Sequence, residues 1–139
     1  MKKVLVFAAH PDDEIIGCGG TLLKYKEKGY KLSIVFFTDG ISSRFSKNKV
    51  TTNKIEKLIK LRKKQALKVG KRLEAEVYFH NFEDNALDQY PLLKVVKIVE
   101  EYKNKLKPNI VLTHYYNDLN VDHQVISKAV ITAFRPKKT

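Results

Sequence analysis

The run His10-Pro11-Asp12-Asp13-Glu14 places one imidazole and three carboxyl groups within five consecutive residues. A catalytic zinc ion commonly takes imidazole nitrogens and a carboxylate oxygen as protein ligands and keeps one position open. His10 and Asp13 have the right chemistry for two of these ligands, which leaves Asp12 as a base beside the ion. Capping of a following helix would explain one or two carboxylates. It does not explain His10, so we favour a metal site.

A second polar cluster, residues 113–123, supplies what the first one lacks. We expect His123 to be the third ligand, with His114 as the competing candidate. The adjacent carboxylate of Asp122 is expected to accept the other N–H of a ligating histidine or to orient a catalytic imidazole.

These residue types predict hydrolysis of an amide or an ester. Zinc bound by two nitrogens and a carboxylate lowers the pKa of a bound water to about 7. Asp12 is then placed to accept the proton and to return it to a leaving amine as a general acid. The metal and a nearby hydrogen-bond donor would stabilise the oxyanion.

Apolar, β-branched runs alternate along the chain with helical patterns of 3.6-residue spacing. Gly70 is expected to end the second helix. A polar loop is expected from the second strand to about Val50. The predicted strands are Lys3–Ala8, Lys31–Phe37, Ala75–Phe79 and Asn109–Thr113, and the predicted helices are Glu14–Lys28, Thr51–Val69, Pro91–Leu106 and His123–Phe134.

This alternation predicts a Rossmann-like α/β fold with three α/β/α layers and a mainly parallel sheet of strand order 3-2-1-4. Each polar cluster follows the carboxyl end of a strand, so all four are expected to meet at one edge of the sheet. The clusters are His10–Asp13, Thr38–Gly40, His80–Asp88 and His114–His123.

With 139 residues, 43% hydrophobic and 30% charged, the sequence is typical of a single globular domain spanning 1–139. No apolar run approaches the ~20 residues of a membrane-spanning helix. The start Met1-Lys2-Lys3 lacks a signal-peptide pattern, and the single cysteine fits a reducing compartment. We therefore expect a cytoplasmic protein.

The formal charge of +12 is concentrated in residues 44–72, which hold twelve of the 27 basic residues and one of the 15 acidic ones. We favour a solvated lysine face, and contact with an anionic surface is the alternative. No aromatic residue between Phe45 and Tyr78 is available to stack on bases, so we expect no nucleic-acid partner.

Several motifs together resemble the PIG-L/LmbE-like N-deacetylase family. The specific ones are His10-Pro11-Asp12-Asp13-Glu14 and the distant Asp122-His123. Supporting similarities are Gly17-Cys18-Gly19-Gly20, Arg62 with Ala66 and Gly70, and Phe82-Glu83-Asp84-Asn85 with Leu87-Asp88. The resemblance runs from residue 3 to about residue 136.

The resemblance implies a zinc enzyme that removes acetyl groups from N-acetylglucosamine-type conjugates. It implies His10, Asp13 and His123 as ligands and Asp12 as the general base, in agreement with the residue chemistry. We further expect Glu14, Arg44, Asp84 and Asn85 to contact the substrate.

Two departures from the family pattern carry further expectations. Many members have His-Pro-Asp-His where this chain has Asn120, so the oxyanion donor is Asn120, His114 or another group. Family chains usually continue further, so this chain is expected to lack their C-terminal segment, to expose a sheet edge and to form a homo-oligomer. The alternative function is a catalytically weak module that binds anionic glycoconjugates or a membrane surface.

Overall fold

The computed structural model describes residues 1–46 and 52–137. Its four strands are parallel and lie in the order β3-β2-β1-β4, which confirms the predicted topology. The strands are β1 (Lys3–Ala8), β2 (Lys31–Thr38), β3 (Ala75–Phe82) and β4 (Ile110–Leu112). The helices are α1 (Asp13–Glu27), α2 (Thr52–Leu73), α3 (Leu92–Leu106) and α4 (Val121–Ala133), and two short 3₁₀ helices are η1 (Ser42–Arg44) and η2 (Leu87–Gln89).

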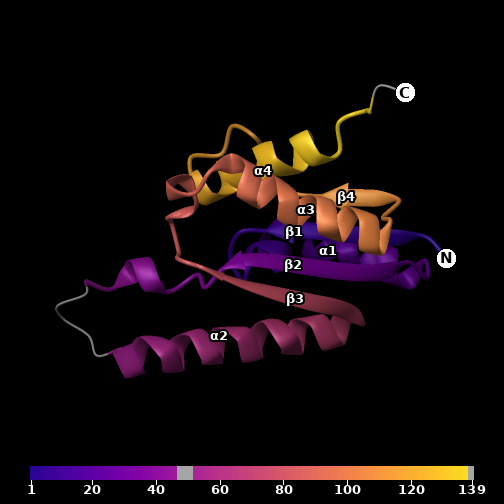
Figure 1. The fold of residues 1–139 in the computed structure, drawn as a ribbon. Coiled ribbons are helices and arrows are strands. Elements are labelled where there is room, and N and C mark those ends of the chain that lie inside the picture. Colours follow the sequence, from indigo (N-terminus) through magenta and orange to yellow (C-terminus); the bar gives the residue numbers. More distant parts are fainter. Residues whose placement is uncertain (47–51, 138–139) are drawn as a thin grey trace.

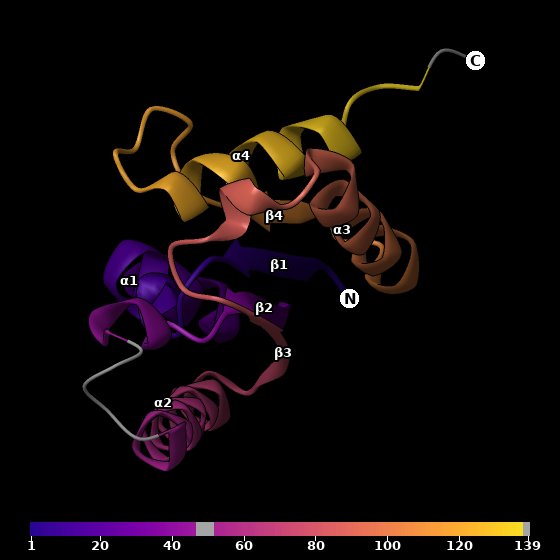
Figure 2. The ribbon, with the colours of Figure 1, turned by 60° about the vertical axis from the view of Figure 1, so that its left-hand side comes forward.

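The side chains of β1 alternate between two cores because successive residues of a strand point to opposite faces. Leu5 and Phe7 are buried in a core closed by α3 and α4. Val4 and Val6 are buried in a second core, to which α1 and α2 contribute Leu22 and Ala66. Figures 1 and 2 show the resulting three layers, with one helix pair on each face of the sheet.

Most predicted boundaries lie within two residues of the observed ones, and the two larger differences each have a visible reason. Gly70 does not end α2, which continues to Leu73 before Glu74 takes a left-handed backbone conformation with φ 52°. A Cβ atom at Gly70 would lie 2.5 Å from Val77 Cγ2, so the glycine allows α2 to pack closely on β3. β3 extends beyond Phe79 to Phe82, because Phe82 pairs with Thr38 after an irregularity in the ladder.

The segment after β2 contains η1 rather than a uniform loop. The expected loop end at Val50 and the expected helix start at Thr51 lie outside the described residues. No helix within residues 1–46 and 52–137 is long and apolar enough to cross a membrane.

Candidate metal centre

The strand order reverses between β1 and β4, and this switch point is where ligands bind in open parallel sheets. The segments that follow β1 and β4 carry the clusters that contain His10 and His123, so the fold brings these two residues together from positions 113 residues apart. All four predicted clusters contribute a residue there, since one cavity is lined by His10, Gly40, Asp84 and His123. His80 itself is not among them, because its ring lies on the α3 side and its Nε2 is 2.9 Å from the hydroxyl of Tyr102.

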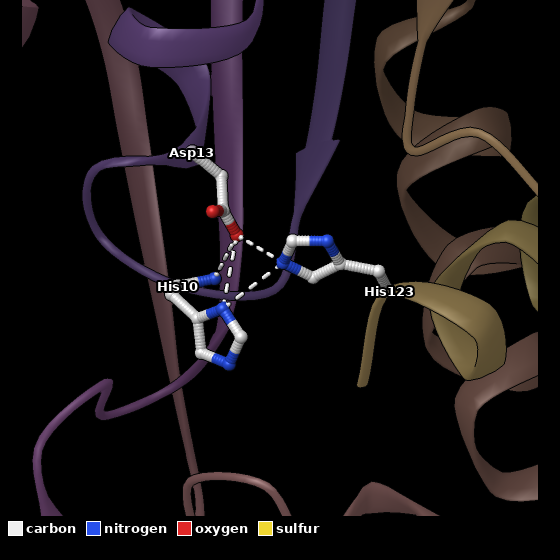
Figure 3. Close-up of side chains that lie close together, drawn as sticks. All are labelled: His10, Asp13 and His123. Carbon is white, nitrogen blue, oxygen red and sulfur yellow. Dashed lines mark hydrogen bonds and ion pairs between the residues drawn. The ribbon is translucent and has the colours of Figure 1, made fainter. Parts of the chain in front are cut away.

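Three donor atoms form a nearly equilateral triangle at the switch point (Figure 3). His10 Nδ1 lies 3.1 Å from Asp13 Oδ2 and 3.2 Å from His123 Nε2, and the last two atoms are 3.1 Å apart. Four ligand atoms around one zinc ion at its usual bond lengths lie about 3.3 Å from one another. The spacing therefore fits ligands of one tetrahedral cation.

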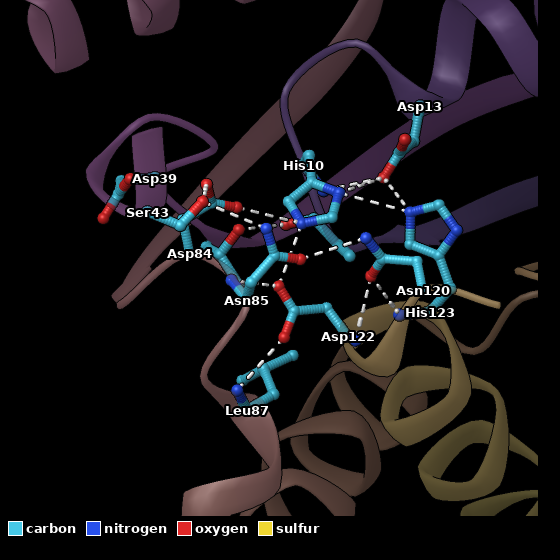
Figure 4. Close-up of polar contacts among 12 residues, drawn as sticks. His10, Asp13, Asp39, Ser43, Asp84, Asn85, Leu87, Asn120, Asp122 and His123 are labelled. Atoms are coloured by element: carbon cyan, nitrogen blue, oxygen red, sulfur yellow. Dashed lines mark hydrogen bonds and ion pairs between the residues drawn. The ribbon is translucent and has the colours of Figure 1, made fainter. Parts of the chain in front are cut away.

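Asp122 and Asp84 hold the far nitrogen of His10 (Figure 4). His10 Nε2 lies 2.9 Å from Asp122 Oδ2 and 3.1 Å from Asp84 Oδ1. Because a carboxylate can only accept, Nε2 carries the hydrogen and Nδ1 presents its lone pair to the triangle. The expected pairing of Asp122 with a ligating histidine is present, but its partner is His10 rather than the adjacent His123.

Asp118 performs the same task for His123. Its Oδ2 lies 3.0 Å from His123 Nδ1, which places the hydrogen on Nδ1 and turns the Nε2 lone pair towards the triangle. The hydrogen bond to His123 lowers the pKa of Asp118. Sequence reasoning missed Asp118, although a carboxylate five residues before a predicted ligand was a signal that could have been weighed.

The triangle is electrostatically suited to a cation. Burial alone would lower the pKa of His10, but hydrogen bonds to Asp122, Asp13 and Asp84 outweigh it and raise that pKa to about 11. Burial would raise the pKa of Asp13, yet its hydrogen bonds with His10 and His123 hold it well below the usual range. Three lone pairs converge here, so a proton or a metal ion between them relieves their repulsion.

His114 lies behind His123 instead of in the triangle. The two rings stack with centroids 3.7 Å apart, and His114 Nε2 accepts the backbone N–H of Ala9 at 2.9 Å. Burial and the neighbouring His123 lower the pKa of His114 to about 4, so its ring is neutral at pH 7. The Nε2 lone pair is therefore already used, which favours His123 over His114 as the ligand.

Asp12 is the first residue before α1, but its side chain makes no capping hydrogen bond. Its Oδ2 instead accepts from Arg62 Nη2 at 2.9 Å across the site. The capping explanation for this carboxylate therefore fails. Arg62, noted in the sequence for its family spacing, is the residue that holds Asp12 beside the triangle.

Asn120 caps the N-terminus of α4. Its Oδ1 accepts from the backbone N–H groups of Asp122 and His123, and its Nδ2 donates to Asn85 Oδ1 at 3.0 Å. An amide nitrogen has two hydrogens, so one remains for another acceptor. The cap also fixes the first turn of α4, on which both Asp122 and His123 stand.

The four predicted substrate contacts fall in three different environments. Arg44 and Asn85 line a cavity of about 320 Å³ beside the triangle, together with Asp12, Arg62 and Asn120. Asp84 also lines it, but its carboxylate is 7% exposed and bonded to His10 and Ser43. Glu14 is 2% exposed and lines a second, largely apolar cavity of about 410 Å³, which shares Asp13 and His123 with the first. Burial raises the pKa of Glu14 to about 7.

Comparison with known proteins places the chain in a family. The family model for PIG-L, the GlcNAc-PI de-N-acetylases, matches residues 5–134. The Bacillus anthracis protein named "Probable N-acetyl-alpha-D-glucosaminyl L-malate deacetylase 2" is 25% identical over 134 residues, which is 95% of this chain and 59% of that protein.

Two solved structures share the fold. N,N'-diacetylchitobiose deacetylase from Pyrococcus horikoshii has a TM-score of 0.80 at 26% identity, covering 95% of this chain and 49% of its own. The 4-carboxy-2-hydroxymuconate hydratase GalB from Pseudomonas putida KT2440 has a TM-score of 0.79 at 25% identity, covering 96% and 55%. The chain thus spans about half to six tenths of the length of these relatives. On the family match, which covers nearly all of its length, the chain belongs to the PIG-L family of deacetylases.

Proposed function

We propose that this chain is a zinc-dependent hydrolase that removes the N-acetyl group from an amino-sugar conjugate. The observation that supports this most directly is the triangle of His10, Asp13 and His123, in which both imidazoles are oriented by carboxylates so that their lone pairs converge. This donor set, two nitrogens and one oxygen, suits zinc and leaves room for a water molecule.

The residues around the triangle would divide the reaction between them. A divalent cation held there would acidify a water molecule and polarise the acetyl carbonyl. The Asp12 carboxylate, which lines the same cavity, would accept the proton of the attacking water and pass it to the sugar nitrogen as the amide bond breaks. Arg62 would keep Asp12 in place during both transfers.

Asn120 is our choice for the oxyanion donor. Its second amide hydrogen is available and it lines the cavity that holds Asp12. His114, the other candidate, does not line the cavity that holds Asp12, and its Nε2 accepts the backbone N–H of Ala9. Asn120 is neutral, so we expect weaker oxyanion stabilisation than a protonated histidine at this position would give.

The amino-sugar substrate is supported by the relatives. The family description and the two named deacetylases refer to acetylated glucosamine units attached to phosphatidylinositol, malate or a second sugar. GalB, a hydratase, shows that the same scaffold also occurs with a different reaction. The substrate experiment below therefore has to measure acetate itself.

The first experiment measures bound metal and acetate release on the same preparations. We expect about one zinc per chain and release of acetate from N-acetylglucosaminyl conjugates. His10→Ala should lose the metal, whereas Asp12→Asn should keep the metal and lose turnover by about 10²–10⁴-fold, the usual contribution of a general base. Full activity in Asp12→Asn would refute the base assignment. Zinc binding without acetate release would favour the binding-module alternative.

A further inference from the structure

The cavity beside the triangle is lined by an unequal set of charges. Three carboxylates, Asp12, Asp13 and Asp84, face two guanidinium groups, Arg44 and Arg62. A divalent cation bound by Asp13 and by the neutral imidazoles of His10 and His123 would therefore leave this lining with a net positive charge. A positively charged pocket attracts a substrate that carries a negative group.

Each carboxylate of the lining already has a partner. Asp12 binds Arg62 at 2.9 Å, Asp84 contacts His10 at 3.1 Å, and Asp13 belongs to the triangle. Within residues 1–46 and 52–137, the Arg44 guanidinium is the charge on this lining that has no ion-pair partner. Arg44 is thus the charged group of this lining that can form an ion pair with a substrate.

The backbone around Arg44 is fixed to the metal centre. In η1, the backbone N–H and the hydroxyl of Ser42 both donate to Asp39. The Ser43 hydroxyl donates to Asp84, which itself contacts His10 (Figure 4). Asn85 Nδ2 donates to Ser43 Oγ at 3.0 Å. Arg44 is the last residue of this turn, so the hydrogen bonds of Ser42 and Ser43 fix where its side chain starts relative to the metal centre.

Arg62 lines the same cavity but is held by the fold. Its Nη2 is bound to Asp12, but its Nε is buried and has no hydrogen-bond acceptor in the described part of the chain. Because this N–H is enclosed by the protein, a ligand oxygen cannot reach it, and the exposed Arg44 is the guanidinium group open to a ligand. Arg44 and Arg62 come from different elements, η1 and α2, and both line this cavity.

We propose that Arg44 is a specificity-determining residue that selects conjugates bearing a carboxylate or a phosphate beside the N-acetylated sugar. Guanidinium groups bind both anions through paired, charge-assisted hydrogen bonds. The inference rests on the proposed function and makes it more specific, because neutral conjugates would lack this contact.

Three probes test the selection: N-acetylglucosaminyl L-malate for the carboxylate, N-acetylglucosamine 1-phosphate for the phosphate, and methyl N-acetylglucosaminide as the neutral reference. In Arg44→Gln we expect the ratio of anionic to neutral kcat/KM to fall about 10–100-fold, chiefly through a higher KM. Arg44→Lys should restore part of the ratio, because lysine keeps the positive charge but lacks the paired N–H donors of a guanidinium group. The anionic probe whose kcat/KM falls more in Arg44→Gln identifies the preferred anion.

The control is Arg72→Gln, which removes the same charge from α2 but lies outside the cavity lining. It should keep the wild-type ratio. An Arg44→Gln ratio within twofold of wild type would overturn the proposal, as would an equal loss on all three probes. If the wild-type protein turns over none of the probes, the proposed function is refuted separately from the role of Arg44. Calorimetric titration of the same probes into the zinc-loaded protein then tests the role of Arg44, through the ratio of the affinities for anionic and neutral probes.

Discussion

Replacing Asp122 with asparagine is expected to weaken both the metal centre and the fold. The Asp122 side chain is fully buried and accepts three hydrogen bonds, from His10 Nε2 at 2.9 Å, Asn85 N at 2.7 Å and Leu87 N at 3.1 Å. Asparagine has one acceptor oxygen in place of two and adds an amide group that donates. Whichever way the amide turns, at least one of the three N–H groups faces another N–H.

The magnitude follows from these contacts. A buried donor left without an acceptor costs about 1–3 kcal/mol, so the free energy of unfolding should fall by about that much. Loss of the carboxylate behind a ligating histidine usually weakens metal binding about 10–100-fold. Because Asp84 Oδ1 also lies 3.1 Å from His10 Nε2, we expect the lower end, about 10-fold, for Asp122→Asn. Asp84→Asn/Asp122→Asn should reach about 100-fold.

The assay separates the two effects. A zinc-binding titration against a competing chelator gives the affinity, and urea unfolding in the presence of EDTA gives the stability of the metal-free chain. Asp118→Asn is the matched control, since Asp118 orients His123 from a side chain that is 36% exposed. It should weaken zinc binding with little effect on unfolding. A folded double variant that binds zinc with wild-type affinity would refute this orientation mechanism.

Two further predictions concern the fold. Gly70→Ala should lower the free energy of unfolding by about 1–3 kcal/mol, because the new Cβ would lie 2.5 Å from Val77 Cγ2. Gly20→Ala should raise the free energy of unfolding by up to about 1 kcal/mol, because a Cβ there has no atom within 4 Å and alanine favours the helix. Urea unfolding measures both variants, and equal effects would contradict the packing argument. Burial lowers the pKa of His80, so the unfolded chain binds a proton at higher pH than the folded one, and His80 stabilises the fold less as pH falls below about 6.5. The difference in unfolding free energy between wild type and His80→Gln should therefore shrink between pH 7 and pH 5, and a constant difference would show that His80 is not responsible.

The layers and strand order were predictable because each follows from periodicity over many residues. The alternation of Val4 and Val6 with Leu5 and Phe7 fits a strand buried on both faces, and parallel strands require covering helices. Local boundaries were less predictable. Gly70 looks like a helix stop in sequence, and only the close approach of β3 shows that it serves packing.

Some features of the candidate site were likewise predictable from the sequence, and others were not. His10, Asp13 and His123 were accessible because their types match a known donor set and they follow strands that meet at the switch point. The partners of Asp122 were not accessible from the sequence. Asp122 and His123 are neighbours in the chain, yet consecutive helical residues point about 100° apart, because a turn takes 3.6 residues.

This divergence explains how one helical turn serves both imidazoles. His123 points into the triangle, while Asp122 points beneath it towards His10, a residue from the opposite side of the site. Asp118, five residues earlier and outside α4, is then free to orient His123. A single cap at Asn120 fixes the start of this turn, so a change there would displace a ligand and the partner of another ligand together. The pairing of adjacent residues with distant partners makes the metal centre a property of the switch point rather than of either motif alone.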